Sequence, residues 1–408
     1  MSLEGYAIKD IEKVIIGIDG RKVTKVDIAR LSAPGENYLS LVFSVDILVE
    51  DRAGRRETIK AVAKRLPLVE MKFNMSAMMM KNEIKFYSKI EPLLREFAKE
   101  YEFNTDYYPK YLGSRLSLDP EETEPDAETV LFIKNLLPEG YINEDRHIGF
   151  DLEAAKAILK TLARFHGIPL AMKFKNPEFF EVIKKTLEHP NFSGPPKNGP
   201  PEDAVDPDDL MWENIVKIPA CQPYVSNLKK LQENLLPMPE RFIGGGKEPW
   251  NTVSHNDFWV NNMLIKVPGY LVKLLDFQGC SYSSFARDLV FFLLTSVRDE
   301  IQQTHFDDLL RYYYDELTAV LVKIHVPKLK FSYEEYLEEV NRVATKLEVS
   351  HALTFCNVIF AVKGAQKDHL TGEVDMFEKM KEMMNNMGER QKEKIGLVVK
   401  LCVRRGWL

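Results

Sequence analysis

The chain has 408 residues, 45% of them hydrophobic, which is enough to bury a large core in two lobes. Its formal net charge of −6 and the lack of a long basic stretch give no electrostatic case for a nucleic-acid partner or an anionic membrane surface. It has no apolar run long enough to span a bilayer, no signal-peptide core and four scattered cysteines without CxxC spacing, so we expect a cytoplasmic protein with reduced thiols.

Residues 1–135 are predicted to form a small antiparallel sheet with one helix. Residues 23–31 and 38–48 roughly alternate apolar and polar side chains, as half-buried strands do, and a turn at 34–37 separates them. Backbone N–H groups in such a turn, and a hydroxyl just after it, can contact phosphate oxygens. The candidates for that contact are Gly35, Asn37, Tyr38 and Ser40. Because the turn has a single glycine, it is not a GxGxxG loop, and an ordinary hairpin is the competing interpretation.

An apolar strand over residues 59–64 ends in Lys64. A lysine in that place either extends its amine to water or points it at a bound phosphate. Residues 75–101 follow with helical periodicity and carry Glu83 on their first half. A glutamate there can pair with Lys64 and orient it, because an unpaired lysine in a partly closed site is costly to desolvate. Neither residue alone indicates a phosphate-binding site, so the assignment depends on the motifs further along the chain.

Two further strands are predicted at 108–112 and 129–133, around an acidic, proline-bearing stretch that is expected to be a solvated loop. Residues 133–136 then form a hinge between a region 1–135 and a region 136–408. The backbone groups of this hinge can hydrogen-bond an adenine edge while apolar side chains contact the ring. The candidate residues are Ile133, Asn135 and Leu136.

The region 136–408 is predicted to be mainly helical. Its first helix covers 150–166, with Asp151 as the N-cap and Gly167 as the residue that ends it. No nucleophile accompanies His166 in this segment. We therefore expect His166 to be a hydrogen-bonding core residue that supports a neighbouring loop.

Later segments of this region are also expected to be helical. Asp288 precedes an apolar helix over 289–296 and either caps it or holds the metal-binding loop, and the cap is the favoured interpretation. Further helices are predicted at 331–353 and 377–403. The stretch 189–209 is rich in proline, glycine and acidic residues, so it is expected to be irregular, either as a lid or as a spacer.

The most informative stretch is residues 255–262, His-Asn-Asp-Phe-Trp-Val-Asn-Asn, which fits the pattern HxDxxxxN. In that pattern Asp257 takes a proton from a hydroxyl and Asn262 holds a metal ion. After a short interval, Asp276 begins the run Asp-Phe-Gln, where protein kinases carry the metal-binding Asp-Phe-Gly. The motifs occur in the order that phosphoryl transfer requires, and they predict a site for ATP and Mg²⁺.

The interval between the two motifs is a predicted hairpin. Residues 263–267 and 270–275 are apolar runs separated by the turn dipeptide Pro268-Gly269. Asn262 and Asp276 should therefore lie at adjacent open ends of two paired strands. Phosphoryl transfer needs this proximity, because its base and its metal ligands must act within a few ångströms of one another.

Over most of its length the chain resembles the ecdysteroid kinase-like, or CHK-type, family within the aminoglycoside and choline phosphotransferase superfamily. The tryptophan after the catalytic aspartate and the glutamine of DFQ are the most discriminating features, since protein kinases ordinarily show neither. The segments that carry the resemblance are GENYLS, AVAKRLP, NEIKFYSKI, LARFHG, HNDFWVNNMLIK and LLDFQ.

The resemblance implies an α+β fold of the bilobal protein-kinase type, with a small antiparallel sheet plus helix in the N-lobe and a larger, mainly helical C-lobe. It implies ATP- and Mg²⁺-dependent transfer of a phosphate to a hydroxyl of a small, lipophilic acceptor, such as an ecdysteroid or another sterol or glycoside. Matched position by position, Asp257 is the base, Asn262 and Asp276 are the metal ligands, Lys64 is the phosphate lysine and Glu83 its partner.

Alternatives stay open at this point: a catalytically weak relative that binds lipophilic ligands, a choline- or aminoglycoside-type kinase, or a protein kinase of unusual sequence. Asn256 stands where many protein kinases have an arginine that receives a phosphorylated activation loop, and no APE-like segment follows Asp276. We therefore predict no regulation by phosphorylation between Gln278 and Asp288. We also expect a small-molecule alcohol as the acceptor and no obligate protein partner.

Overall fold

The computed structural model describes residues 7–15, 20–31, 39–67, 73–187, 207–235, 246–326, 332–362 and 376–408. Three of the candidate phosphate-contacting residues, Gly35, Asn37 and Tyr38, lie outside these ranges. The same holds for most of the irregular stretch predicted at 189–209. Within the described ranges, no helix combines the length and the apolar character needed to cross a membrane.

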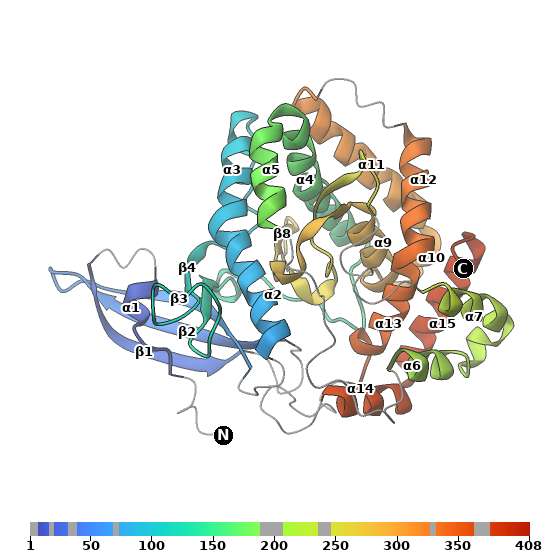
Figure 1. Cartoon of the computed structure of the whole chain (residues 1–408), viewed down its shortest axis with the longest axis horizontal. Coiled ribbons are helices and arrows are strands. Elements are labelled where there is room, and N and C mark those ends of the chain that lie inside the picture. The colour runs from blue at the N-terminus through green and yellow to red at the C-terminus, as the bar shows by residue number, and fades with distance from the viewer. Residues whose placement is uncertain are drawn as a thin grey trace.

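Five antiparallel strands form the N-terminal sheet, in the order β1-β2-β3-β5-β4 (Figure 1). They are β1 (Lys22–Arg30), β2 (Leu41–Glu50), β3 (Arg56–Arg65), β4 (Tyr111–Arg115) and β5 (Val130–Lys134). Buried and half-buried residues alternate along β2, as the sequence pattern predicts. The strand expected at 108–112 begins only at Tyr111, because Pro109 has no N–H to donate to a strand partner.

The two faces of this sheet belong to different cores. Val130 and Phe132 pack with the inner residues of β2 and with the short helix α1 (Ile11–Val14). Leu131 and Ile133, which alternate with them along β5, pack instead in the large core shared with the helices. The second face therefore joins the sheet to the rest of the molecule.

The helix predicted at 75–101 is confirmed, with one irregularity. It consists of α2 (Phe73–Lys85), a π-helical turn at Phe86–Ile90 and α3 (Glu91–Glu100). Pro92 follows the π-helical turn directly, so its missing N–H falls where the regular helical hydrogen-bonding pattern is already interrupted. In Figure 1 this long helix runs from the sheet to the helical part of the molecule, so it links the two.

The first helix of the C-terminal part, α4 (Leu152–Lys175), is longer than predicted. Asp151 caps it as expected, accepting a backbone N–H bond of 2.9 Å. Gly167, however, does not end it. A Cβ at Gly167 would lie 2.8 Å from Cγ1 of Val320, on the neighbouring α11 (Phe306–Lys323). This glycine permits close helix packing and is not a C-cap.

The remaining helices surround α4 and α11 (Figure 1). They are α5 (Pro177–Thr186), α6 (Pro207–Ile215), α7 (Val225–Glu233), α9 (Ala286–Thr295), α10 (Asp299–Thr304), α12 (Tyr333–Val343), α13 (Val349–Ile359), α14 (Met376–Asn385) and α15 (Glu389–Arg404). The helix expected at 377–403 is wrong as a single element, because Gly388 starts α15 and bonds Gln391 as its N-terminal cap. A π-helical turn at Ala344–Glu348 joins α12 to α13.

Two small antiparallel pairs carry the functional motifs. The pair β7 (Met263–Lys266) and β8 (Leu271–Leu274) is the predicted hairpin, with Met263 opposite Leu274. The pair β6 (Asn251–Ser254) and β9 (Ser281–Ser284) brackets the segment that contains both motifs. The predicted α+β fold, with an antiparallel N-terminal sheet and a mainly helical remainder, is confirmed. The division into 1–135 and 136–408 stays a prediction.

Candidate functional site

Lys64 is the centre of a buried charge cluster. Its Nζ lies 2.5 Å from Oε2 of Glu83 and 2.7 Å from Oδ1 of Asp276. The side chains of Lys64 and Glu83 are only 8% and 1% exposed, whereas that of Asp276 is 26% exposed. The contact brings together the end of β3, the last turn of α2 and the second residue after β8. The structure thus joins three residues that the sequence analysis selected separately.

Electrostatics keep this lysine charged. Burial by itself lowers the pKa of Lys64, but Asp276 and Glu83 outweigh that effect and raise the pKa above its ordinary value. Burial also raises the pKa of Glu83, and Lys64 opposes that shift. A protonated amine between two carboxyl groups is thereby fixed in one position. Because the amine is already held in position, it can donate a hydrogen bond to a further anion without first changing its rotamer.

The side-chain amide of Asn262 holds the two ends of the catalytic-loop motif together. Nδ2 of Asn262 donates to the backbone oxygen of Asp257 at 2.8 Å and to its Oδ2 at 2.8 Å. Since the amide nitrogen is used inside the loop, Oδ1 of Asn262 is the atom that remains to face a metal ion. The other carboxylate oxygen of Asp257, Oδ1, is buried and has no hydrogen-bond partner among the described residues. A buried acceptor of this kind is suited to receive a proton from a substrate.

Burial raises the pKa of Asp257 to about 6, and the nearby Asp276 adds to the shift. His255 and the hydrogen bond from Asn262 act in the opposite direction. A carboxylate with this pKa is more basic than an exposed aspartate, so it accepts a hydroxyl proton more readily. The residue that the motif predicts as the base therefore has the environment that such a role requires.

Asp276 is placed by an unusual backbone conformation. Its φ of 64° lies in the left-handed region, which aspartate tolerates better than most residues do. The N–H of the preceding Leu275 donates to the oxygen of Asn262 at 2.8 Å, so the two candidate metal ligands lie at adjacent strand ends. His255 adds a second link, because its Nε2 lies 2.8 Å from the oxygen of Leu275.

Asp288 supports the catalytic loop, and its interpretation as a helix cap is wrong. Its carboxylate accepts the backbone N–H groups of His255 at 2.6 Å and Asn256 at 2.7 Å. His166 contacts it through Nε2 at 2.8 Å and is bonded through Nδ1 to Tyr313 at 2.7 Å. Burial alone raises the pKa of Asp288, but His166 outweighs burial and lowers it. His166 is thus the supporting core histidine that was predicted.

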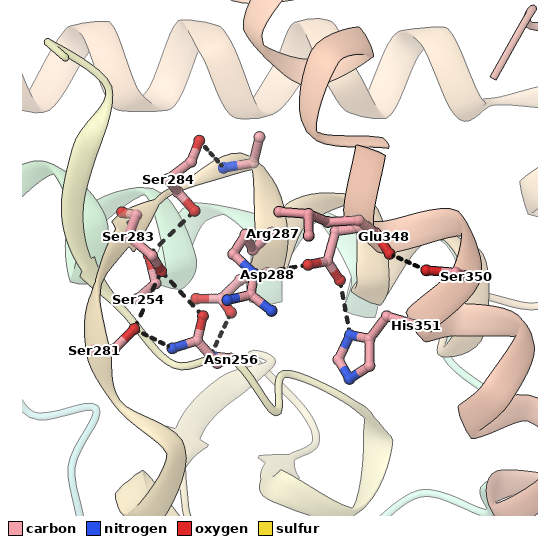
Figure 2. Close-up of polar contacts among 12 residues, drawn as sticks. Ser254, Asn256, Ser281, Ser283, Ser284, Arg287, Asp288, Glu348, Ser350 and His351 are labelled. Carbon is pink, nitrogen blue, oxygen red and sulfur yellow. Dashed lines mark hydrogen bonds and ion pairs between the residues drawn. The ribbon is translucent and has the colours of Figure 1, made fainter. Parts of the chain in front are cut away.

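Asn256 fastens the segment after Asp276 to the catalytic loop (Figure 2). Its Nδ2 donates to the oxygen of Gly279 at 2.8 Å and to Oγ of Ser281 at 2.7 Å, and its Oδ1 accepts from Ser283 at 3.1 Å. An uncharged amide therefore makes all three of these bonds between the two segments. The expectation that no phosphorylation switch exists here stays a prediction.

The same segment is attached to α2. The ring of Phe277 stacks on Phe86 with centroids 4.0 Å apart. Nδ2 of the buried Asn82 donates to the oxygens of Gln278 at 2.7 Å and Cys280 at 3.1 Å. Because Glu83 follows Asn82 directly, these bonds fix the relative position of Glu83 and the Asp276 segment. The sequence analysis assigned no role to Asn82, although this residue begins the segment NEIKFYSKI that carries part of the family resemblance.

Asn135 fastens the hinge to the sheet. The N–H of Asn135 donates to the oxygen of Lys60 at 3.0 Å, its Nδ2 donates to Ser44 at 3.3 Å, and its Oδ1 accepts the N–H of Leu137 at 3.1 Å. These bonds attach the hinge to β2 and β3, and a role for Asn135 in nucleotide binding stays a prediction. Leu136 is buried in a small cluster with Tyr141 and Leu264.

The other two nucleotide candidates are also buried. Ile133 lies in the large core, and its backbone pairs with Val62 and Tyr111 on the two neighbouring strands. Ser40 is buried just before β2 begins. A role for Ile133, Leu136 or Ser40 in nucleotide binding stays a prediction.

The residues present fit a magnesium ion held jointly with a nucleotide. Within the described part of the chain, no group of three or more His, Cys, Asp and Glu residues has the geometry of a metal site. Mg²⁺ is usually held by one or two carboxylates together with substrate phosphates and water. The pair formed by Asn262 and Asp276 has that composition, with an amide oxygen in place of a second carboxylate.

One family model and several solved structures are similar to this chain. The model of the ecdysteroid kinase-like family matches residues 34–326. Among solved structures, the chain is similar to an ethanolamine kinase of Plasmodium vivax, with 9% identity, a TM-score of 0.44, and coverage of 99% of this chain and 89% of that one. It is also similar to an aminoglycoside-3′-phosphotransferase of type VIII, with 12% identity, a TM-score of 0.32, and coverage of 75% and 93%. A search of curated protein sequences found no match.

Proposed function

Because the chain belongs to the ecdysteroid kinase-like family, we propose that it is a phosphotransferase that uses ATP and Mg²⁺ to phosphorylate a hydroxyl group of a small, lipophilic acceptor. The acceptor class is an ecdysteroid or another sterol or glycoside. The observation that carries the proposal is the arrangement of Lys64 between Glu83 and Asp276. In the catalytic loop, Oδ1 of Asp257 is buried and has no hydrogen-bond partner among the described residues.

Asp257 is the base in this proposal. Its Oδ1 receives the hydroxyl proton while the acceptor oxygen bonds to the γ-phosphorus of ATP and the bond from that phosphorus to the β–γ bridging oxygen breaks, so that ADP leaves with the electron pair. Asn262 keeps the carboxylate oriented through its Oδ2. Burial makes Asp257 a better proton acceptor and also excludes water that would compete with the hydroxyl. The raised pKa, about 6, supports the role because the group is still mostly ionised at neutral pH.

Lys64 and the metal ligands act on the nucleotide. Mg²⁺, when bound by Asn262 and Asp276, neutralises charge on the phosphate oxygens during transfer. Lys64 is bonded to both Glu83 and Asp276 in the structure. We infer that Asp276 turns toward the metal when the nucleotide binds, and that Glu83 then holds Lys64 while its amine donates to a phosphate oxygen.

The adenine is proposed to lie against the hinge. Leu136 packs with Leu264 of β7, and Leu275 lies at the edge of the same cluster. These side chains offer an apolar surface within a few residues of both Asn262 and Asp276. Ser40, together with Gly35, Asn37 and Tyr38, is still proposed to contact the phosphates.

Two aromatic residues close to the motifs along the chain are not available to an acceptor. Phe258 and Phe285 lie near the chemistry along the chain, but both are fully buried. They belong to the core and do not form an aromatic cage for a cationic acceptor such as choline. The intact set of Lys64, Asp257 and Asp276 argues against a purely ligand-binding role.

The test is Mg²⁺-dependent ATP consumption against a panel of ecdysteroids, sterols, glycosides, aminoglycosides and choline, with mass spectrometry of the products. Asp257→Asn should still bind ATP but lose about 10²-fold or more in rate. Asp308→Asn is the matched control, because Asp308 is an exposed aspartate on a distant helix. Wild-type activity in Asp257→Asn would overturn the mechanism. Transfer to proteins but to no small molecule would favour the protein-kinase alternative.

A further inference from the structure

Asn143 connects the linker after the hinge to the catalytic loop. Its Nδ2 donates to three backbone oxygens of that loop, those of Val260 at 3.0 Å, Asn261 at 3.3 Å and Met263 at 3.0 Å. These three oxygens lie on both sides of Asn262, the candidate metal ligand, along the chain. The proposed chemistry has so far assigned no role to Asn143.

A strand-like pairing places Asn143 beside the loop. The preceding residue, Ile142, exchanges two backbone hydrogen bonds with Ile265 of β7, at 2.8 and 2.9 Å. Along an extended strand every second carbonyl group points to the same side, so the oxygen of Met263 faces the linker as that of Ile265 does. The side chain of Asn143 donates to this oxygen in place of a further backbone N–H group.

The short turn that carries the candidate metal ligand also depends on Asn143. Residues Val260–Asn262 form a single 3₁₀ turn. The last carbonyl groups of a helical turn lack N–H partners within the turn itself. Asn143 supplies a donor to the oxygens of Val260 and Asn261 from a different part of the chain. It therefore acts as a C-terminal cap for the turn.

The other polar groups of Asn262 are fixed as well. Its N–H donates to the oxygen of Trp259 at 2.9 Å, and its oxygen accepts the N–H of Leu275 at 2.8 Å. Its Nδ2 is bonded to Asp257, which leaves Oδ1 for a metal ion. Because every other group of Asn262 is held by the backbone around it, the direction of Oδ1 depends on the position of the loop that Asn143 holds.

We propose that Asn143 is a positioning residue for the metal site, which directs Oδ1 of Asn262 toward the magnesium ion by holding the backbone on both sides of it. This inference rests on the proposed function, because it requires that Asn262 binds the metal. Asn143 acts through the loop and is not itself a metal ligand. Residues that orient metal ligands typically contribute about tenfold to a hundredfold to metal affinity.

The exposure of Asn143 separates this role from a purely structural one. Because the residue is exposed, removal of its side chain creates no cavity, and water can replace its amide at the three oxygens. The stability of the fold should therefore change little. The loop around Asn262, however, loses the donor that fixes it, so metal affinity should fall by more than the change in stability explains.

The experiment is calorimetric titration with ATP at a series of fixed Mg²⁺ concentrations, including none. The variants are Asn143→Ala and Asn143→Leu, the second of which keeps about the size of the side chain but has no N–H to donate. Thermal melting reports on the fold. Hydrogen exchange of the loop amides, measured without metal, reports on the mobility of residues 259–263.

Asn227→Ala is the matched control. Nδ2 of Asn227 also donates to the backbone oxygen of a residue distant in the chain, that of Leu408 at 3.1 Å. Asn227 lies on α7, at the outer edge of the helical part (Figure 1). This variant should behave as the wild type does in every measurement.

We expect both Asn143 variants to need about tenfold more Mg²⁺ than the wild type for half-maximal ATP binding. ATP binding without Mg²⁺, and ATP binding at saturating Mg²⁺, should be unchanged. The melting temperature should fall by less than about 3 °C, and residues 259–263 should exchange their amide hydrogens faster than in the wild type.

Other outcomes overturn the inference. An unchanged Mg²⁺ requirement in both variants would do so, and so would an equal loss of ATP affinity with and without Mg²⁺. Wild-type metal affinity in Asn143→Leu would show that the size of the side chain matters and its N–H group does not. If the wild type binds no ATP in the presence of Mg²⁺, the proposed function itself fails, and that result is distinct from Mg²⁺-dependent binding that ignores Asn143.

Discussion

Lys64 and Asp276 are 212 positions apart in the chain, yet Nζ of the first lies 2.7 Å from Oδ1 of the second. The contact joins the sheet to the hairpin of the helical part. In the proposed mechanism both residues act on the nucleotide phosphates, one as a cation and one through a metal. The contact therefore holds the two residues in place before any nucleotide binds.

Asp276→Asn should show whether Asp276 binds the metal ion. Asparagine adopts the left-handed backbone conformation as readily as aspartate does, so the hairpin should stay intact. The variant loses the negative charge that a magnesium ion requires, and Mg²⁺-dependent ATP binding should disappear. Calorimetric titration with ATP, with and without Mg²⁺, is the measurement. Undiminished Mg²⁺-dependent binding by the variant would show that Asp276 is not a metal ligand.

Asn82→Ala should lower the rate without touching the nucleotide directly. The change removes two hydrogen bonds to the Asp276 segment and leaves the oxygens of Gln278 and Cys280 without that donor. We expect a loss of about 1–3 kcal/mol in the free energy of unfolding, together with a lower kcat. Urea denaturation and steady-state kinetics measure the two effects. Asn104→Ala, in an exposed loop, is the control and should change neither quantity.

Asp288 should give the stability of the fold a specific pH dependence. Its pKa in the folded protein lies below the ordinary value of 3.8, so its contribution is fully present above pH 3.8 and is lost as the pH falls through the lowered value. Asp288→Asn should be less stable than the wild type at pH 7 by about 3 kcal/mol, since it disrupts a buried charged network. The difference should shrink below pH 3.8. A difference that stays constant down to pH 3 would contradict the assignment.

The parts of the site that could be predicted from sequence are those with a local pattern. Asp257 and Asn262 share one short motif, and a two-stranded hairpin fixes the distance from there to Asp276. Lys64 and Glu83 are individually ordinary. They could be selected only because the strand and the helix that carry them come in the right order before the motif.

What sequence could not supply depends on contacts between distant elements. Asp288 looks like a helix cap because caps are the commonest role for an aspartate at that place, and only the fold brings it to the loop around Asn256.

Gly167 illustrates the same limit and gives a test. After an amphipathic run, a glycine favours a helix end, but here it lets α4 and α11 approach closely. Gly167→Ala adds a methyl group against Val320, a β-branched residue that has little freedom to move in a helix. We expect the variant to lose about 1–3 kcal/mol in the free energy of unfolding from overpacking, although alanine is the better helix former.

The second variant, Val320→Ala, makes that prediction specific. Alone it should be destabilising, because it removes buried methyl groups. In the double variant the methyl group introduced by Gly167→Ala fills part of the space that Val320 vacates, so the total loss should be smaller than the sum of the two single losses. Urea denaturation of the four proteins measures the coupling. Strict additivity would mean that the two sites do not touch and that the close approach of the two helices is not what Gly167 provides.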